Sequence, residues 1–350
     1  MKAIKFCFLV NALALVCSGS NILSNFRVVI TNETVLSAIA ERFEVHSRTA
    51  QGYEVYVPAN RAKEFLEIAP SSELLEYDIR ATYDRLKQRS PSWLAGYHTF
   101  SQVEEILADY EKVYPSIATR QRYGTSKQGN PLYALRLSAA QEPRAEVLIT
   151  AATHGDELIT VEVVLGIMEA LIKNFAINPQ IRGLLEEYAV YFVPVVNPDG
   201  FKTQDRYDNG RDPNRSYPWP QNPSNTPTGS VGPLIEFVSS RKFAASIDFH
   251  ASGEMIMYPW AYTHSSPPSD DEKEFVRLGR MMAQHNDYSV GQISKIIYLA
   301  PGSSADYFYW KLRSVSFGIE IARSKVPHSS EIPAVLEDNL HSTLAFIQSF

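Results

Sequence analysis

The amino-acid sequence predicts an α/β protein in which a doubly wound, mixed sheet is flanked by helices and follows a small α+β domain. Over residues 97–350, apolar strand-like segments alternate with long helical segments, an order typical of a doubly wound sheet. Several of these strands run directly into polar loops, and open α/β sheets carry their sites outside the carboxyl ends of strands. Residues 21–83 instead predict the order βαββαβ, which is typical of a ferredoxin-like unit.

Composition and charge limit the function classes. The chain has 350 residues, of which 45% are hydrophobic and 21% charged, as in ordinary soluble globular proteins. This length accommodates one large domain and one small one. The formal net charge of −6 gives no basic footprint for nucleic acid, so we expect no nucleic-acid partner. The oligomeric state is open.

Residues 1–20 are predicted to be a signal peptide. Lys2 and Lys5 precede an apolar run from Phe6 to Val16, and small residues follow. The run is too short to span a bilayer, so we expect export to the periplasm or the exterior without stable membrane insertion. A retained anchor and a lipoprotein are the alternatives. Both cysteines, Cys7 and Cys17, lie in this segment, and an exported protein without disulfides favours a bacterial source.

The small domain is predicted over residues 21–83. Its expected elements are strand 26–31, helix 33–43, a hairpin over 44–58 that turns near Gln51 and Gly52, helix 59–69 and strand 73–79. No candidate ligands cluster in it. Residues 84–96 form a charged, proline-containing linker that carries Lys87 and Arg89.

The larger domain is predicted over residues 97–350. A capping box of Ser101 and Glu104 is expected to start a helix that continues to about Tyr114. The further expected elements are a hairpin turning at Gly129 and Asn130, strand 147–150, helix 157–175, strand 188–196, an irregular loop over 210–233, strand 243–249 and strand 317–321 with Glu320 in its middle.

Three of the predicted strands bring polar residues that suit a metal. His154 and Glu157 follow the first of them, three positions apart, which is expected to place both on one face of the first helical turn. His250 directly follows strand 243–249. Two histidines and one glutamate form a common catalytic zinc site. Glu320 lies in an apolar strand, where a carboxylate needs a partner or a function; an ion pair with Arg323 is the structural alternative.

Seven segments of the chain resemble motifs of one enzyme family, and they occur in the same order as in that family. They are YHTFSQVEEIL, HGDE, NPDGF, RDPNRSY, IDFHASGEMIMYPW, IIYLAPGSSADY and FGIEIAR. From about Tyr97 to the C-terminus the chain resembles the zinc carboxypeptidase A family of metallopeptidases. The resemblance implies one Zn²⁺ per chain, with His154, Glu157 and His250 as its ligands.

The resemblance also implies roles for residues outside the metal ligands. Glu320 matches the glutamate that activates the zinc-bound water and passes its proton to the leaving amine. Arg206 matches the arginine that polarises the scissile carbonyl, although Arg211 could serve if the register shifts. Three further residues match those that bind the carboxylate of the substrate, namely Asn214, Arg215 and the mobile Tyr298.

The sequence departs from the digestive members at several positions. Asp156 stands between two ligands where they carry an arginine, and its charge is expected to repel upstream substrate carbonyls. The HGDE motif also occurs in bacterial relatives that cut cell-wall stem peptides. Ala305 and Gly318 predict a roomy, apolar specificity pocket, but Asp306 is next to Ala305 and a one-residue shift would reverse this expectation.

Three functions remain open at the level of sequence. The first is an exported zinc carboxypeptidase that hydrolyses the C-terminal bond of peptides. The second is an amidase or D-specific carboxypeptidase that acts on peptidoglycan stem peptides. The third is a binding module on the same fold, which the presence of His154, Glu157, His250 and Glu320 disfavours. The small domain resembles the family's propeptides in element order only, and either a cleaved cover or a permanent domain is compatible with it.

Overall fold

The computed structural model describes residues 23–30, 32–49, 52–76 and 96–350. The chain divides into two compact units, one up to Ala95 and one from Gly96, and each is described by itself. The predicted signal peptide and residues 84–95 of the predicted linker lie outside the described residues. Within the described ranges, no helix is both long and apolar enough to cross a membrane.

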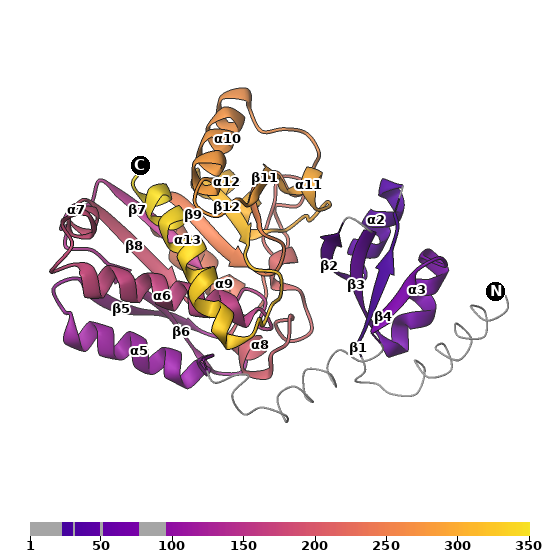
Figure 1. The fold of residues 1–350 in the computed structure, drawn as a ribbon, viewed down its shortest axis with the longest axis horizontal. Coiled ribbons are helices and arrows are strands. Elements are labelled where there is room, and N and C mark those ends of the chain that lie inside the picture. The colour runs from indigo at the N-terminus through magenta and orange to yellow at the C-terminus, as the bar shows by residue number, and fades with distance from the viewer. Residues whose placement is uncertain (1–22, 31, 50–51, 77–95) are drawn as a thin grey trace. The chain divides into compact units, whose positions relative to one another are not determined.

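The N-terminal unit is built on a four-stranded antiparallel sheet with the order β2-β3-β1-β4. Its elements follow the expected sequence: β1 (Leu23–Val28), α2 (Glu33–Ala40), β2 (Glu44–Thr49), β3 (Gly52–Pro58), α3 (Ala62–Ile68) and β4 (Glu73–Glu76). The helices α2 and α3 lie next to each other (Figure 1). Phe26, Ile39, Val55 and Phe65 form its apolar core.

The large unit contains an eight-stranded mixed sheet with the order β11-β10-β12-β9-β7-β8-β6-β5. Its strands are β5 (Ala118–Thr125), β6 (Pro131–Leu137), β7 (Ala145–Thr150), β8 (Tyr188–Val193), β9 (Phe243–His250), β10 (Met255–Tyr258), β11 (Ser289–Gln292) and β12 (Val315–Glu320). The four adjacent strands β12, β9, β7 and β8 run parallel. The pair β5 and β6 is the predicted hairpin.

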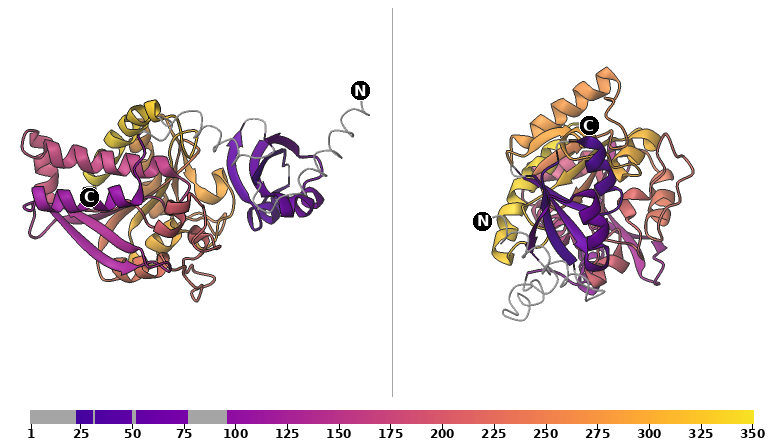
Figure 2. Two further views of the ribbon diagram at one scale, coloured as in Figure 1. Left: turned by 90° about the horizontal axis from the view of Figure 1, so that it is seen from below. Right: turned by 90° about the vertical axis from the view of Figure 1, so that its right-hand side faces the viewer.

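Helices cover both faces of this sheet, as expected for a doubly wound fold. They are α5 (Phe100–Val113), α6 (Leu158–Asn174), α7 (Pro179–Glu187), α8 (Pro198–Thr203), α9 (Val231–Ser239), α10 (Ser269–Ala283), α11 (Ile293–Ile296), α12 (Ser304–Leu312) and α13 (Ile332–Ile347). In Figure 1 and in the view from below in Figure 2, α6 and α13 lie side by side on one face. On the other face, α9 and α12 pack on a core that includes Leu148 and Tyr191.

Several predicted element ends were wrong, among them the start of α5 and the end of β12. The helix α5 is capped by Thr99, whose hydroxyl accepts the Gln102 N–H (3.3 Å) while the Gln102 side chain accepts the Thr99 N–H (2.8 Å); Ser101 therefore lies inside the helix. Glu320 ends its strand and does not lie in the middle of it.

The parallel strands bring the candidate residues to one edge of the sheet. β12, β9 and β7 are neighbours, so their carboxyl ends meet. His250 and Glu320 are the last residues of β9 and β12 and pair in register. The loop after β7 carries His154 and Glu157.

Candidate metal centre

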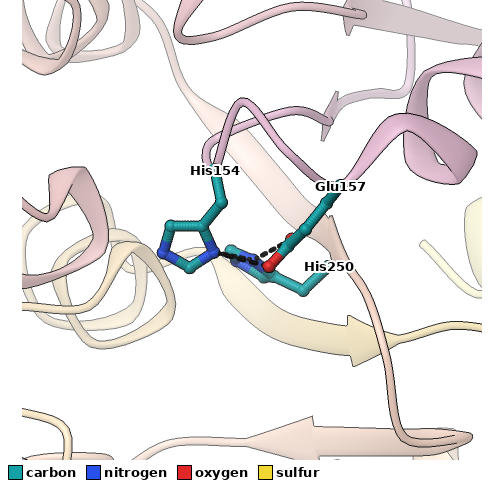
Figure 3. A group of neighbouring side chains, drawn as sticks. All are labelled: His154, Glu157 and His250. Carbon is teal, nitrogen blue, oxygen red and sulfur yellow. Dashed lines mark hydrogen bonds and ion pairs between the residues drawn. The ribbon is translucent and has the colours of Figure 1, made fainter. Parts of the chain in front are cut away.

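His154, Glu157 and His250 converge, and their donor atoms all lie within 4.8 Å of one another. His154 Nδ1 is 2.8 Å from Glu157 Oε1, and His250 Nδ1 is 3.1 Å from Glu157 Oε2. The two Nδ1 atoms are 3.3 Å apart. All three side chains are buried. Figure 3 shows both rings directed at the carboxylate.

The local route to this arrangement differs from the one predicted. His154 and Glu157 do not share a helical turn, because α6 begins at Leu158 and Glu157 is its N-cap residue. A turn closes instead, with the Glu157 N–H bonded to the His154 carbonyl (3.3 Å). Ala152 enters this loop with a φ of 46°. A spacing of three therefore brings the ligands together through a turn.

A second carboxylate lies behind each histidine, and the sequence analysis missed both. His154 Nε2 is 3.1 Å from Asp212 Oδ1, and His250 Nε2 is 3.0 Å from Asp248 Oδ2. Such partners fix the tautomer and orientation of metal-binding histidines. The D-x-H spacing could have identified Asp248 as a partner of His250 from the sequence. The approach of Asp212 to His154, in contrast, depends on the path of the long loop.

This chemistry suits a cation. In the tautomer that donates Nε2–H to Asp212 and Asp248, both Nδ1 lone pairs face each other and the Glu157 carboxylate. The Ala251 N–H donates to Glu157 (3.1 Å) and Arg206 approaches His154, yet two ring nitrogens and a carboxylate oxygen still lie close enough together to bind one cation. Burial opposes a charged imidazole, but Asp248 and Glu157 outweigh it and raise the pKa of His250 well above its usual value. Two imidazole nitrogens and one carboxylate are ordinary zinc donors.

Glu320 is a buried carboxylate beside this group. Burial, and then the charge of Glu157, raises its pKa to about 7. Its Oε2 atom is buried without a hydrogen-bond partner among the described residues. The alternative of an ion pair with Arg323 is not observed, because the Arg323 guanidinium donates to Glu254 (3.0 and 3.1 Å) at the surface.

Of the two arginines considered in the long loop, Arg206 is the one at the centre. Its Nη1 lies 3.3 Å from His154 Nδ1 and 3.8 Å from Glu157 Oε1, and its Nη2 donates to Asp212 (2.9 Å). Arg211 is exposed and donates to the Thr226 carbonyl (2.8 Å). Of these two arginines, Arg206 is therefore the one whose positive charge lies next to the candidate metal ligands.

Asn214, Arg215 and Tyr298 are brought together as well. The Arg215 guanidinium donates to the Tyr298 hydroxyl (3.1 Å) and lies 5.6 Å from the centre of that ring. Asn214 Oδ1 accepts the Ser304 N–H (2.8 Å), and its Nδ2 is 3.2 Å from His250 Nε2. A planar guanidinium of this kind suits a carboxylate ligand.

Comparison with known proteins agrees with this site. Residues 103–342 match the zinc carboxypeptidase family. The chain belongs to the zinc carboxypeptidase family. Members of this family are hydrolases that act on peptide bonds, and they use zinc.

Individual relatives are distant. A zinc carboxypeptidase of Saccharothrix mutabilis subsp. capreolus is 29% identical over 67% of this chain and 64% of its own length. Carboxypeptidase D of Mus musculus is 24% identical, and the chain spans only 21% of it. Carboxypeptidase A1 of Mus musculus is 24% identical over 84% of this chain and 85% of its own.

Solved structures show the same fold. Carboxypeptidase A from Helicoverpa armigera aligns with a TM-score of 0.80 over 94% of this chain and 98% of its own, at 16% identity. A metallocarboxypeptidase from Burkholderia cenocepacia aligns with a TM-score of 0.59 over 73% of this chain and 70% of its own, at 17% identity.

Of the two residues predicted to line the specificity pocket, Ala305 has apolar surroundings and Gly318 borders open space. Ala305 is buried among Met257, Ala261, Ile293 and Ala300, with Tyr298 packed against this cluster. A Cβ atom added at Gly318 would meet no atom within 4 Å, so there is open space beside β12.

Asp306, which could have made the predicted apolar pocket charged, is instead hydrogen-bonded to backbone N–H groups. Its two oxygens accept the N–H groups of Ala261 (2.8 Å) and Tyr262 (2.9 Å). Burial raises its pKa to about 7. Asp306 therefore acts as a structural link between α12 and the segment after β10.

Asp156 is not the unpaired negative charge that the sequence suggested. Lys325 Nζ donates to Asp156 Oδ2 at 2.7 Å, and the Lys325 side chain is only 6% exposed. The partners are 169 positions apart, so sequence inspection could not pair them. Lys325 compensates this charge, and the effect of Asp156 on upstream substrate groups stays a prediction.

Proposed function

We propose that this protein is an exported, zinc-dependent metallocarboxypeptidase that hydrolyses the C-terminal bond of peptides. The observation that carries the proposal is the convergence of His154, Glu157 and His250 at the strand ends where the Glu320 carboxylate also lies. The ligand set leaves room for water or substrate, as catalytic zinc sites do.

Each residue has a distinct part in this proposal. Zinc held by His154, Glu157 and His250 would supply Lewis acidity for the carbonyl and lower the pKa of water. Glu320 takes a proton from the attacking water and delivers it to the leaving amine, for which a base with a pKa near neutrality is suited. Arg206 donates to the oxygen on which negative charge develops.

We assign binding of the substrate's C-terminal residue to the remaining candidate site residues. Asn214 and Arg215 bind the C-terminal carboxylate, and Tyr298 closes over it. Ala305 and Gly318 line the pocket for the last side chain, and their small size together with the apolar surroundings favours a large apolar residue.

A comparison of free and amidated peptides tests the carboxylate clamp. Arg215→Ala should weaken transition-state binding of a peptide with a free C-terminus by about 2–5 kcal/mol, the cost of removing one partner of a desolvated charge pair. It should matter much less for the amidated peptide, which the wild type should cut poorly. Equal losses for both substrates would assign Arg215 a purely structural role.

The competing substrate class is the peptidoglycan stem peptide, which the HGDE motif suggested. A parallel assay with linear peptides and muropeptides distinguishes the two. Turnover confined to muropeptides would replace the proposed substrate but keep the metal chemistry. Turnover of neither, in protein that binds one zinc per chain, would contradict the enzymatic proposal.

The role of the N-terminal unit and the export route are further proposals. We infer a propeptide role for residues 21–83, with cleavage in the linker at Lys87 or Arg89, and export to the periplasm or exterior after removal of residues 1–20. N-terminal sequencing of active protein tests both. Fully active protein that begins near Ser20 would contradict the propeptide role, and one that retains Met1 would contradict export by a cleaved signal.

A further inference from the structure

Lys325 contacts the chain on both sides of Glu157. Its ammonium donates to Asp156, the residue before Glu157, at 2.7 Å. Its backbone carbonyl accepts the N–H of Ile159, two residues after Glu157, at 3.1 Å. A single residue from the segment after β12 therefore holds the backbone on either side of one candidate metal ligand.

The second of these contacts meets a need created by the site. The first N–H groups of a helix lack partners within the helix and are usually capped by the side chain of the N-cap residue. Glu157 occupies the N-cap position of α6 but makes no capping bond, because its carboxylate faces the two histidines. The Lys325 carbonyl satisfies one of these N–H groups in its place.

The first contact fixes the loop at Asp156, one position before Glu157. At Gly155 the loop lies so close to α8 that an added Cβ atom would come within 2.1 Å of the Gly200 carbonyl carbon. One position later, Asp156 is held by the Lys325 ammonium. The loop is thus fixed sterically on one side and by a charge pair on the other.

We propose that Lys325 is a positioning residue for the metal centre, which acts through Asp156 and Ile159 to hold Glu157 where it meets His154 and His250. Removing one member of a largely buried ion pair leaves the charge of the other less well compensated. Asp156 would then turn toward water and displace the loop between the ligands. The inference rests on the metal site, and it does not depend on which peptide is cut.

Zinc affinity of Lys325→Met, Asp156→Asn and the double variant tests this proposal, with chelator competition as the readout. Groups behind metal ligands typically contribute about 10–100-fold to affinity, and we expect each single variant to lose about 10-fold. The double variant removes both charges of the pair, so its melting temperature should return toward that of the wild type while its zinc affinity stays low. Lys325→Arg should restore affinity because it keeps the charge pair.

The matched control is Lys173→Met. Lys173 pairs with Glu169 on α6 itself, but this pair is exposed, so neither zinc affinity nor melting temperature should change. The proposal would be overturned if the double variant bound zinc as tightly as the wild type, or if Lys325→Met bound zinc more tightly. Either result would show that the two residues affect zinc binding through their charges alone and do not position the loop. Unchanged affinity with a lowered melting temperature would overturn the proposal as well, because Lys325 would then serve stability only.

Discussion

At the scale of single residues, the site combines the Glu157 carboxylate, which contacts both histidines, with the Glu320 carboxylate, whose Oε2 atom has no hydrogen-bond partner in the described part of the chain. Glu157 faces two imidazoles, which together with the hydrogen bonds hold its pKa well below the usual value despite burial. Glu320, the last residue of β12, has its pKa raised to about 7 by burial and by the charge of Glu157. Carboxylates whose pKa values are pushed apart are typical of divided catalytic roles.

The role of Glu320 is tested by Glu320→Gln. The amide keeps the shape of the side chain but cannot take a proton, so we expect kcat to fall by at least ~10²-fold while zinc content and substrate binding are retained. Single-turnover rates, zinc analysis and an inhibitor titration measure the three quantities. A variant that keeps most of its activity would leave Glu320 with only a structural role.

Asp248 is one of the two carboxylates behind the histidines that the sequence analysis missed. It accepts from His250, Thr150 (2.7 Å), Thr153 (3.0 Å) and Ser304 (2.5 Å). Burial opposes its ionisation, but His250 and these donors hold its pKa below the usual value. It therefore stays charged and keeps the proton on His250 Nε2.

Asp248→Asn should weaken zinc binding by about 10–100-fold, the usual effect of removing the partner of a metal-binding histidine. The control is Asp199→Asn, since Asp199 is another buried carboxylate with several donors, namely Ser126, Asn130 and Asn209. It contacts no candidate ligand in these bonds, so that variant should lose stability and keep its zinc affinity. Equal zinc affinities in the two variants would contradict the assignment.

At the scale of elements, the sequence predicted two of the three polar strand ends but not the contacts between distant loops. Apolar runs followed by His154 and His250 are local features, and parallel strands bring such ends together, whereas the position of Glu320 as the last residue of its strand was not predicted. Asp212 and Lys325 reach the site from loops whose paths depend on the whole fold. Their partners, His154 and Asp156, lie 58 and 169 positions away, and no periodicity connects them.

The start of α5 shows the same limit over a short distance. Both Ser101 with Glu104 and Thr99 with Gln102 fit the capping-box spacing. The structure uses the second pair, and burial of Phe100, the first helical residue, is part of that helix start. Hydroxyl spacing alone could not distinguish them.

Thr99→Ala should lower the free energy of unfolding by about 1 kcal/mol, the usual cost of losing an N-cap. Ser101→Ala is the matched variant, because it removes a hydroxyl of the same kind from inside the helix. It should change stability little or raise it slightly, since alanine is the better helix former. Denaturant unfolding of the two variants compares them, and the reverse order of stability would contradict the observed cap.

At the scale of the whole large unit, its first residues are joined to the helix that follows the ligand loop. His98 Nδ1 is 2.7 Å from Glu162 on α6, and the Tyr97 hydroxyl donates to the Pro327 carbonyl (2.7 Å). The hydrogen bond to Glu162 raises the pKa of His98, burial opposes this, and the charges of Glu162 and Glu169 add to it. Protonation of His98 therefore strengthens the attachment of this N-terminal segment.

The sign of the resulting pH dependence follows from linkage. The folded state binds the His98 proton more tightly than the unfolded state, in which the pKa is about 6.5. The stabilisation is thus complete below pH ~6.5 and is lost as pH rises through the higher folded-state pKa. We expect His98→Gln to be less stable than the wild type at pH 6, and the difference should shrink by pH 9. Unfolding free energies measured with a chelator present exclude metal release. His341→Gln, at an exposed pair with Glu337, is the control and should show little effect at either pH. If the loss of stability in His98→Gln is equal at both pH values, the neutral hydrogen bond, and not the charge, holds this segment.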